Sequence, residues 1–154
     1  MNHALERLAG ELGLASADNE RLRLAFGHAC VLRVQHLLEE PEAGKCLREL
    51  GDYLAGATGP AQLQAAAARA AGLASRHQGS RSIDGCGHAA VSATYAVARA
   101  VAGKALEAAG YAAYAVVYAQ GGYAAVAEPE SFGPEFEWQL GTLSALASRV
   151  GAPA

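Results

Sequence analysis

Residues 134–150 read PEFEWQLGTLSALASRV, and this stretch has the clearest helical pattern in the chain. Its apolar residues recur at alternating spacings of four and three, which places them on one face of an α-helix. They are Phe136, Leu140, Leu143, Ala147 and Val150. Pro134 suits the first turn of a helix, where the N–H that proline lacks has no partner to bind. The stretch therefore predicts an amphipathic helix that packs by one face.

Similar patterns extend back to the N-terminus. They predict further helices at about 3–13, 18–40, 42–56, 60–77, 85–102 and 104–127. Pro41 ends the second of these, because proline disfavours a helical conformation in the residue before it. Gly103 separates or bends the last two, and the pair Gly121-Gly122 predicts a kink or fraying. Residues 78–85, QGSRSIDG, have the composition of a loop, and the terminal GAPA ends the last helix.

The composition favours the same fold class. Alanine makes up about a quarter of the 154 residues and is the best helix former, whereas the β-branched and aromatic residues typical of strands are scarce. The length suits one domain with its own core. We therefore expect an all-α fold of about seven helices in a single domain spanning 1–154, with its core at about 18–150. A compact bundle and a short helical-repeat stack both fit the pattern.

Charge and cysteine usage exclude several classes of protein. The net charge of -3 and the pI of about 5.9 do not fit a nucleic-acid-binding protein, which would have a basic face. The first residues lack the apolar run of a signal peptide, and the segment 105–127 is too rich in Ala, Gly and Tyr to predict a membrane span. Three widely spaced cysteines predict neither disulfides nor a zinc site. A cytoplasmic protein fits best.

The sequence contains few candidates for catalysis or metal binding. Asp84-Gly85-Cys86-Gly87-His88 could hold a reactive thiol, but neighbouring helix positions point apart, so capping by Asp84 and a buried Cys86 are the simpler interpretation. His28 and His36 are two helical turns apart and too distant to share a metal. No phosphate-binding loop or nucleophile turn is present. We therefore expect no cofactor, no metal site and no enzymatic activity.

Acidic residues near the C-terminus form the most suggestive surface feature. They are Glu128, Glu130, Glu135 and Glu137, followed by Trp138. Acids at the start of the last helix stabilise its dipole, which explains Glu135 and Glu137 structurally. The functional interpretation is an acidic patch that docks a basic partner, with Trp138 as an anchor. A second acidic cluster comprises Glu39, Glu40 and Glu42.

Two stretches resemble a known family. One is His28-Ala29-Cys30 followed by a Leu/Tyr-rich helix that ends at Gly56, and the other is Glu135-Phe136-Glu137-Trp138-Gln139-Leu140 after alanine-rich helices. Together they resemble small, alanine-rich, all-helical bacterial immunity proteins, over about residues 20–145. The resemblance implies a non-catalytic protein that binds and occludes a cognate toxin. Tyr111 and Tyr114 stand where such proteins have histidines, so no role of those histidines is transferred here.

Two alternatives remain open at the level of sequence. Tyr111, Tyr114 and Tyr118 share one predicted helix face, and with Cys86 and His88 they could line a pocket for a small ligand, with or without catalysis. Tyrosines in this arrangement are more often part of a core. The nearly uncharged centre of the chain could also form the interface of a homo-oligomer.

Overall fold

The computed structural model describes residues 1–77 and 86–150, apart from the side chains of Cys86 and Val150. Within these ranges all regular secondary structure is helical, without a strand, which confirms the all-α class. The α-helices are α1 (His3–Leu12), α2 (Glu20–Leu32), α3 (Pro41–Leu54), α4 (Pro60–Arg76), α5 (Cys86–Val101), α6 (Ala105–Val126) and α7 (Gly133–Val150). Three short 3-10 helices join them: η1 (Ala17–Asn19), η2 (Gln35–Leu37) and η3 (Pro129–Phe132). The predicted loop at 78–85 and the terminal GAPA lie outside the described residues.

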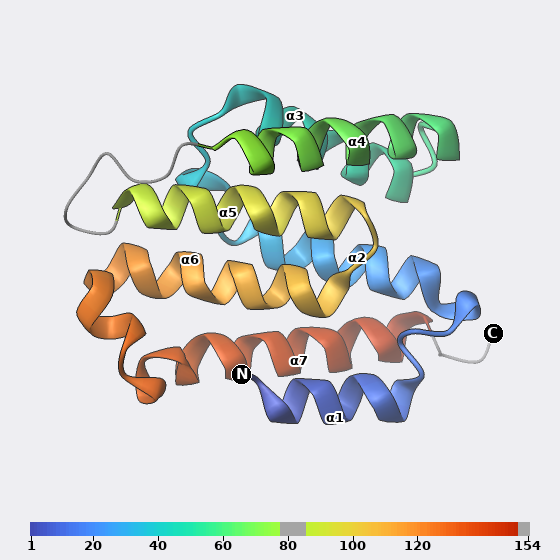
Figure 1. The fold of residues 1–154 in the computed structure, drawn as a ribbon. Coiled ribbons are helices and arrows are strands. Elements are labelled where there is room, and N and C mark those ends of the chain that lie inside the picture. Colours follow the sequence, from blue (N-terminus) through green and yellow to red (C-terminus); the bar gives the residue numbers. More distant parts are fainter. Residues whose placement is uncertain (78–85, 151–154) are drawn as a thin grey trace.

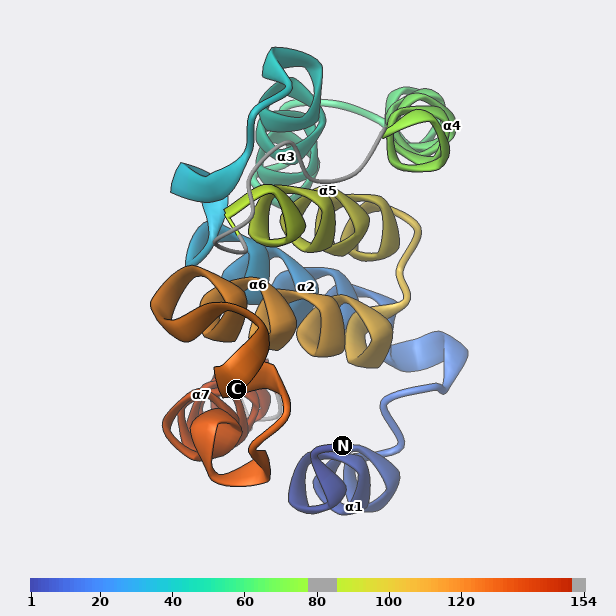
Figure 2. The same ribbon diagram turned by 60° about the vertical axis from the view of Figure 1, so that its left-hand side comes forward.

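The helices form successive layers (Figures 1 and 2). Helices α3 and α4 make one end, α5 and α6 with α2 behind them make the middle, and α7 with α1 makes the other end. The first and last helices are thus neighbours, and α2 contacts α3, α5, α6 and α7. A repeat stack would place successive helix pairs next to one another along the chain. The observed order is that of a compact bundle.

The middle layers pack closely because their side chains are small. Helices α5 and α6 pack side by side over most of their length (Figure 1), and both have buried alanines facing the core. At the crossing of α2 with α5, Gly27 lies so close to Ala100 that an added Cβ would be 3.2 Å from the Ala100 Cα. One buried cluster extends from Leu5 in α1 to Leu143 in α7. This continuous core makes the alanine-rich centre of the chain the centre of the fold.

Two glycines shape α6. Gly103, with φ of 79°, ends the turn after α5, in the left-handed region that favours glycine. Near the other end, Gly122 has φ of 64° and ψ of -149°, so the helix is broken there and a short last turn follows in a new direction. Both features agree with the sequence prediction.

The second helix is shorter than predicted. The pattern favoured a helix over about 18–40, but α2 ends at Leu32 and the chain continues through η2 to the extended residue Leu38. Val34 leaves the helical region, with φ of -117° and ψ of 11°, yet its side chain is fully buried. The apolar residues after Leu32 recur because the chain stays buried beyond the turn, and not because the helix continues.

Candidate functional site

The acidic surface predicted at the start of the last helix is only partly present. Glu135 is 3% exposed, and the Nε of Arg33 donates to both of its carboxylate oxygens at 3.0 and 2.9 Å. The prediction that Glu135 offers a charge to a partner is therefore wrong. Its charge is used inside the molecule, where it fixes α7 against the end of α2.

The neighbours of Glu135 serve the same purpose. Trp138 is half-buried, and the guanidinium carbon of Arg33 lies 4.3 Å from the centre of its ring, which is cation–π geometry. Gln139 is 1% exposed, and its Nε2 donates to the backbone oxygen of Ala109 at 2.8 Å. The segment on which the family resemblance depends thus anchors α7 to α2 and α6. In this segment Glu137 is the acid that stays exposed.

The remaining acids lie in separate places. Glu128 and Glu130 are exposed at η3, beside the start of α7. Glu39, Glu40 and Glu42 are also exposed, but they lie at the start of α3 in the opposite outer layer (Figure 1). The two acidic clusters are therefore treated as separate candidate surfaces.

A row of aromatic rings reaches η3, the short helix that has Glu128 as its N-cap and contains Glu130. His88 stacks on Tyr118 with ring centres 5.3 Å apart, and Tyr123 meets His88 edge-on at 4.9 Å. A hydrogen bond also joins the Tyr123 hydroxyl to Nε2 of His88. Tyr118 continues to Tyr114 at 6.3 Å. We call these residues, together with Phe132 and Phe136, the aromatic row.

The row continues from α6 to α7. Tyr114 meets Phe132 edge-on at 5.2 Å, and Phe132 lies 5.5 Å from Phe136. The row thus joins the first turns of α5 to α6, η3 and α7. Two of its members are unusually exposed for large apolar rings, Tyr114 at 46% and Tyr123 at 55%. Aromatic rings that remain accessible in this way are typical of binding surfaces.

The break at Gly122 explains how the row forms. On a continuous helix, Tyr118 and Tyr123 would point about 140° apart. Because the backbone changes direction at Gly122, Tyr123 turns back and its ring lies 6.0 Å from that of Tyr118. The sequence analysis noted the glycines and the tyrosines separately but did not connect them, and Tyr123 and Phe132 were missed.

The predicted tyrosine stripe is divided between two environments. Tyr111 stacks on Tyr95 at 5.1 Å, with the Arg99 guanidinium near both rings, and packs against the core. Tyr114 and Tyr118 belong to the aromatic row instead. His88 stacks on Tyr118, as the pocket hypothesis required, but is connected to Tyr114 only through Tyr118, and the side chain of Cys86 is outside the described residues.

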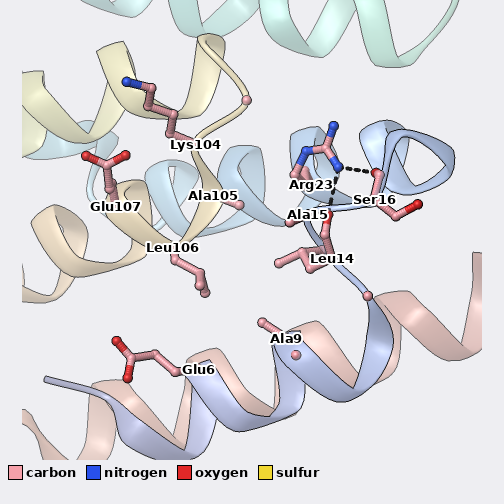
Figure 3. Close-up of a pocket in the computed structure, with 13 residues that line it drawn as sticks. Glu6, Ala9, Leu14, Ala15, Ser16, Arg23, Lys104, Ala105, Leu106 and Glu107 are labelled. Atoms are coloured by element: carbon pink, nitrogen blue, oxygen red, sulfur yellow. Dashed lines mark hydrogen bonds between the residues drawn. The ribbon is translucent and has the colours of Figure 1, made fainter.

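A cavity of about 520 Å³ adjoins the α7 end of the row. It lies between α1, α6, η3 and the start of α7, and Tyr114, Phe132 and Phe136 form part of its wall. A second, more open groove of about 480 Å³ continues from it along α1 and α6 towards Arg23 (Figure 3). The two hollows share Glu6, Leu106 and Glu107, so these residues lie at their boundary.

The described thiols are not suited to nucleophilic catalysis. Cys30 and Cys46 are fully buried, and burial raises the pKa of both thiols, so they stay protonated at neutral pH. Within residues 1–77 and 86–150, no three His, Cys, Asp or Glu side chains lie close enough to hold a metal ion. In the same part of the chain, no helix combines the length and apolarity required to cross a membrane.

Comparison with known proteins leaves the site to be interpreted from its own geometry. No protein-family model, curated protein or solved structure matches the chain.

Proposed function

We propose that this protein acts by binding a protein partner through the exposed tyrosines of the aromatic row and the adjoining acids Glu128 and Glu130. The observation behind the proposal is the exposure of Tyr114 and Tyr123 within a row of rings that is otherwise packed. Tyrosine is enriched among the residues that dominate binding energy, because a rigid ring supplies a large contact area and a hydroxyl. The acids beside the row favour a basic partner and speed its approach.

The resemblance to bacterial immunity proteins suggests what kind of protein the partner is. The partner would be a cognate protein toxin, which the bound domain occludes without catalysis, in the cytoplasm of the producing cell. The segment 135–140 would then support the site from within, since Glu135, Trp138 and Gln139 hold the start of α7, which follows η3 directly, against α2 and α6. This role differs from the direct contact predicted from the sequence.

The first experiment identifies the partner and maps its binding site. The full chain is immobilised, proteins captured from the bacterial host are identified by mass spectrometry, and the purified partner is titrated by calorimetry. We expect Tyr114→Ala with Tyr123→Ala to weaken binding at least about 100-fold, since each truncated anchor residue costs about 2 kcal/mol. Glu128→Lys with Glu130→Lys should mainly slow association.

A matched variant tests the competing surface. Glu39→Lys with Glu40→Lys and Glu42→Lys changes charge at the opposite end of the bundle, and we expect it to bind like wild type. If this variant loses binding while the tyrosine variant keeps it, the docking surface lies at α3 and the present assignment is wrong. If the captured protein is not toxic when produced alone, or if co-production gives no protection, the toxin-neutralising role fails.

A further inference from the structure

The cavity between α1, α6, η3 and α7 has the form of a small-molecule site. Its volume of about 520 Å³ is within the usual range for such pockets. Its inner wall is apolar and partly aromatic, with Leu5, Phe132 and Phe136 from three different elements. This arrangement suits a compact apolar group that enters from the α1–α6 groove.

Gly110 provides room at the wall of this cavity. It lies within α6, where glycine is less favourable than alanine by roughly 0.5–1 kcal/mol. Neither packing nor backbone conformation requires it, because a Cβ at this position would meet no atom within 4 Å and φ is not positive. The absent side chain instead enlarges the cavity that Gly110 lines.

Two kinds of hydrogen-bond acceptor lie among the polar groups of the cavity, an amide oxygen and two carboxylates. Because the Ala109 carbonyl can only accept, the amide nitrogen of the buried Gln139 must face it, and the amide oxygen is left for another donor. No described residue donates to that oxygen. At the boundary with the open groove, Glu6 and Glu107 extend from α1 and α6 (Figure 3). Among the described residues that line the cavity, the charged groups are these two carboxylates and the N-terminal ammonium group of the exposed Met1, so the lining has a net negative charge.

The two carboxylates are only weakly committed to other partners. Glu6 lies 3.5 Å from His3 and Glu107 lies 3.6 Å from Arg99, and both carboxylates are about half exposed. They can therefore turn towards a cation at the mouth. We infer that the cavity binds a small amine with an aryl or alkyl body, whose apolar part lies between Leu5, Phe132 and Phe136 and whose ammonium group lies near Glu6 and Glu107.

The inference is tested by calorimetric titration of the full chain with 4-phenylbutylamine. We expect saturable binding with a Kd of about 1 mM or tighter. The neutral 4-phenylbutanol should bind more weakly and the anionic 4-phenylbutyrate more weakly still, because the mouth is acidic. Absence of saturation up to about 10 mM amine, or tighter binding of the butyrate, would overturn the assignment.

Two variants locate the bound amine. Gly110→Leu fills the cavity and should weaken binding at least about tenfold, whereas Gly141→Leu should leave it unchanged. Gly141 is a matched control because it is an exposed helical glycine, also with nothing within 4 Å of an added Cβ, on a part of α7 that does not line the cavity. Equal affinity of the Gly110→Leu and Gly141→Leu proteins would place the amine elsewhere.

The charge requirement needs a separate variant. Glu6→Gln with Glu107→Gln should reduce the affinity for the amine about threefold to tenfold and leave that for the alcohol unchanged. A double variant that binds the amine as tightly as wild type would refute the role of the carboxylates. None of these outcomes depends on a protein partner, so the result stands apart from the proposed toxin binding.

Discussion

The two sides of α6 differ sharply in packing. Towards α5 and α2, Ala108, Ala112 and Ala115 have no exposed surface. Towards α1, Leu106 is 38% exposed, Gly110 has open space beside it and Tyr114 is 46% exposed. The alanines of α6 are thus covered completely by α5 and α2, whereas the residues that face α1 are covered only in part. The dense side specifies the fold, and the open side, with its cavity and exposed rings, is available for binding.

The largest expected effect comes from breaking the ion pair of the buried Glu135 at the junction of α2 and α7. Arg33→Met keeps a long side chain over Trp138 but leaves the buried Glu135 without its cation. We expect a loss of about 3 kcal/mol in the free energy of unfolding at pH 7, measured with urea. The double variant Arg33→Met with Glu135→Gln should regain much of this loss, because it removes the isolated charge.

If Arg33→Met alone costs less than about 1 kcal/mol, the pair does not anchor α7, and Glu135 is free to turn outward as the sequence first indicated.

A glycine at the tight crossing of α2 and α5 gives the next largest effect. The added Cβ of Gly27→Ala would lie 3.2 Å from both the Cα and the Cβ of Ala100, and the Cα belongs to the backbone of α5. The helices must move apart, which we expect to cost about 1–2 kcal/mol even after the gain in helix propensity. Thermal and urea unfolding measure this cost. An unchanged or raised stability would mean that α2 and α5 are not in close contact.

The same substitution on the open side should have the opposite sign. Gly110→Ala places its methyl group in open space and removes a helical glycine, so we expect a gain of about 0.5–1 kcal/mol in the same assay. Together the two alanine variants compare the tight crossing of α2 and α5 with the open side of α6. A destabilised Gly110→Ala protein would show that α1 closes onto α6 in solution.

The sequence predicted the dense side far better than the open side. Alanine content and helical periodicity are enough to predict the helices and a buried position such as Leu143, because burial repeats with the helical turn. Prolines and glycines marked most helix boundaries for local steric reasons. The end of α2 at Leu32 was not predictable in this way, since no proline or glycine marks it and Val34 stays buried beyond it.

Side-chain partners across the fold could not be derived from one sequence. Glu135 looked like a surface acid at a helix start, and only the position of Arg33, 102 residues away, shows that it is paired. The aromatic row likewise needs the direction of the chain after Gly122, which local propensity does not determine. The candidate site was therefore predicted in its residue types, acids and tyrosines, but not in its geometry.

The smallest expected effect on stability is at His28, which is neither fully buried nor exposed. It is half-buried against α3, where a Cβ on Gly51 would lie 3.1 Å from its Nε2. Burial lowers the pKa of His28 below its ordinary value of 6.5. In the range between the folded and unfolded pKa values, the unfolded chain binds more protons, so stability rises with pH. We therefore expect a modest loss of stability as the pH is lowered from about 7.5 to 5.5, above the range in which most carboxylates titrate.

His28→Gln should remove part of this loss, whereas His36→Gln, at an exposed position, should not. If His28→Gln shows the same loss on acidification as wild type, the imidazole is solvated, and the contact of α2 with α3 is looser than the dense side of α6.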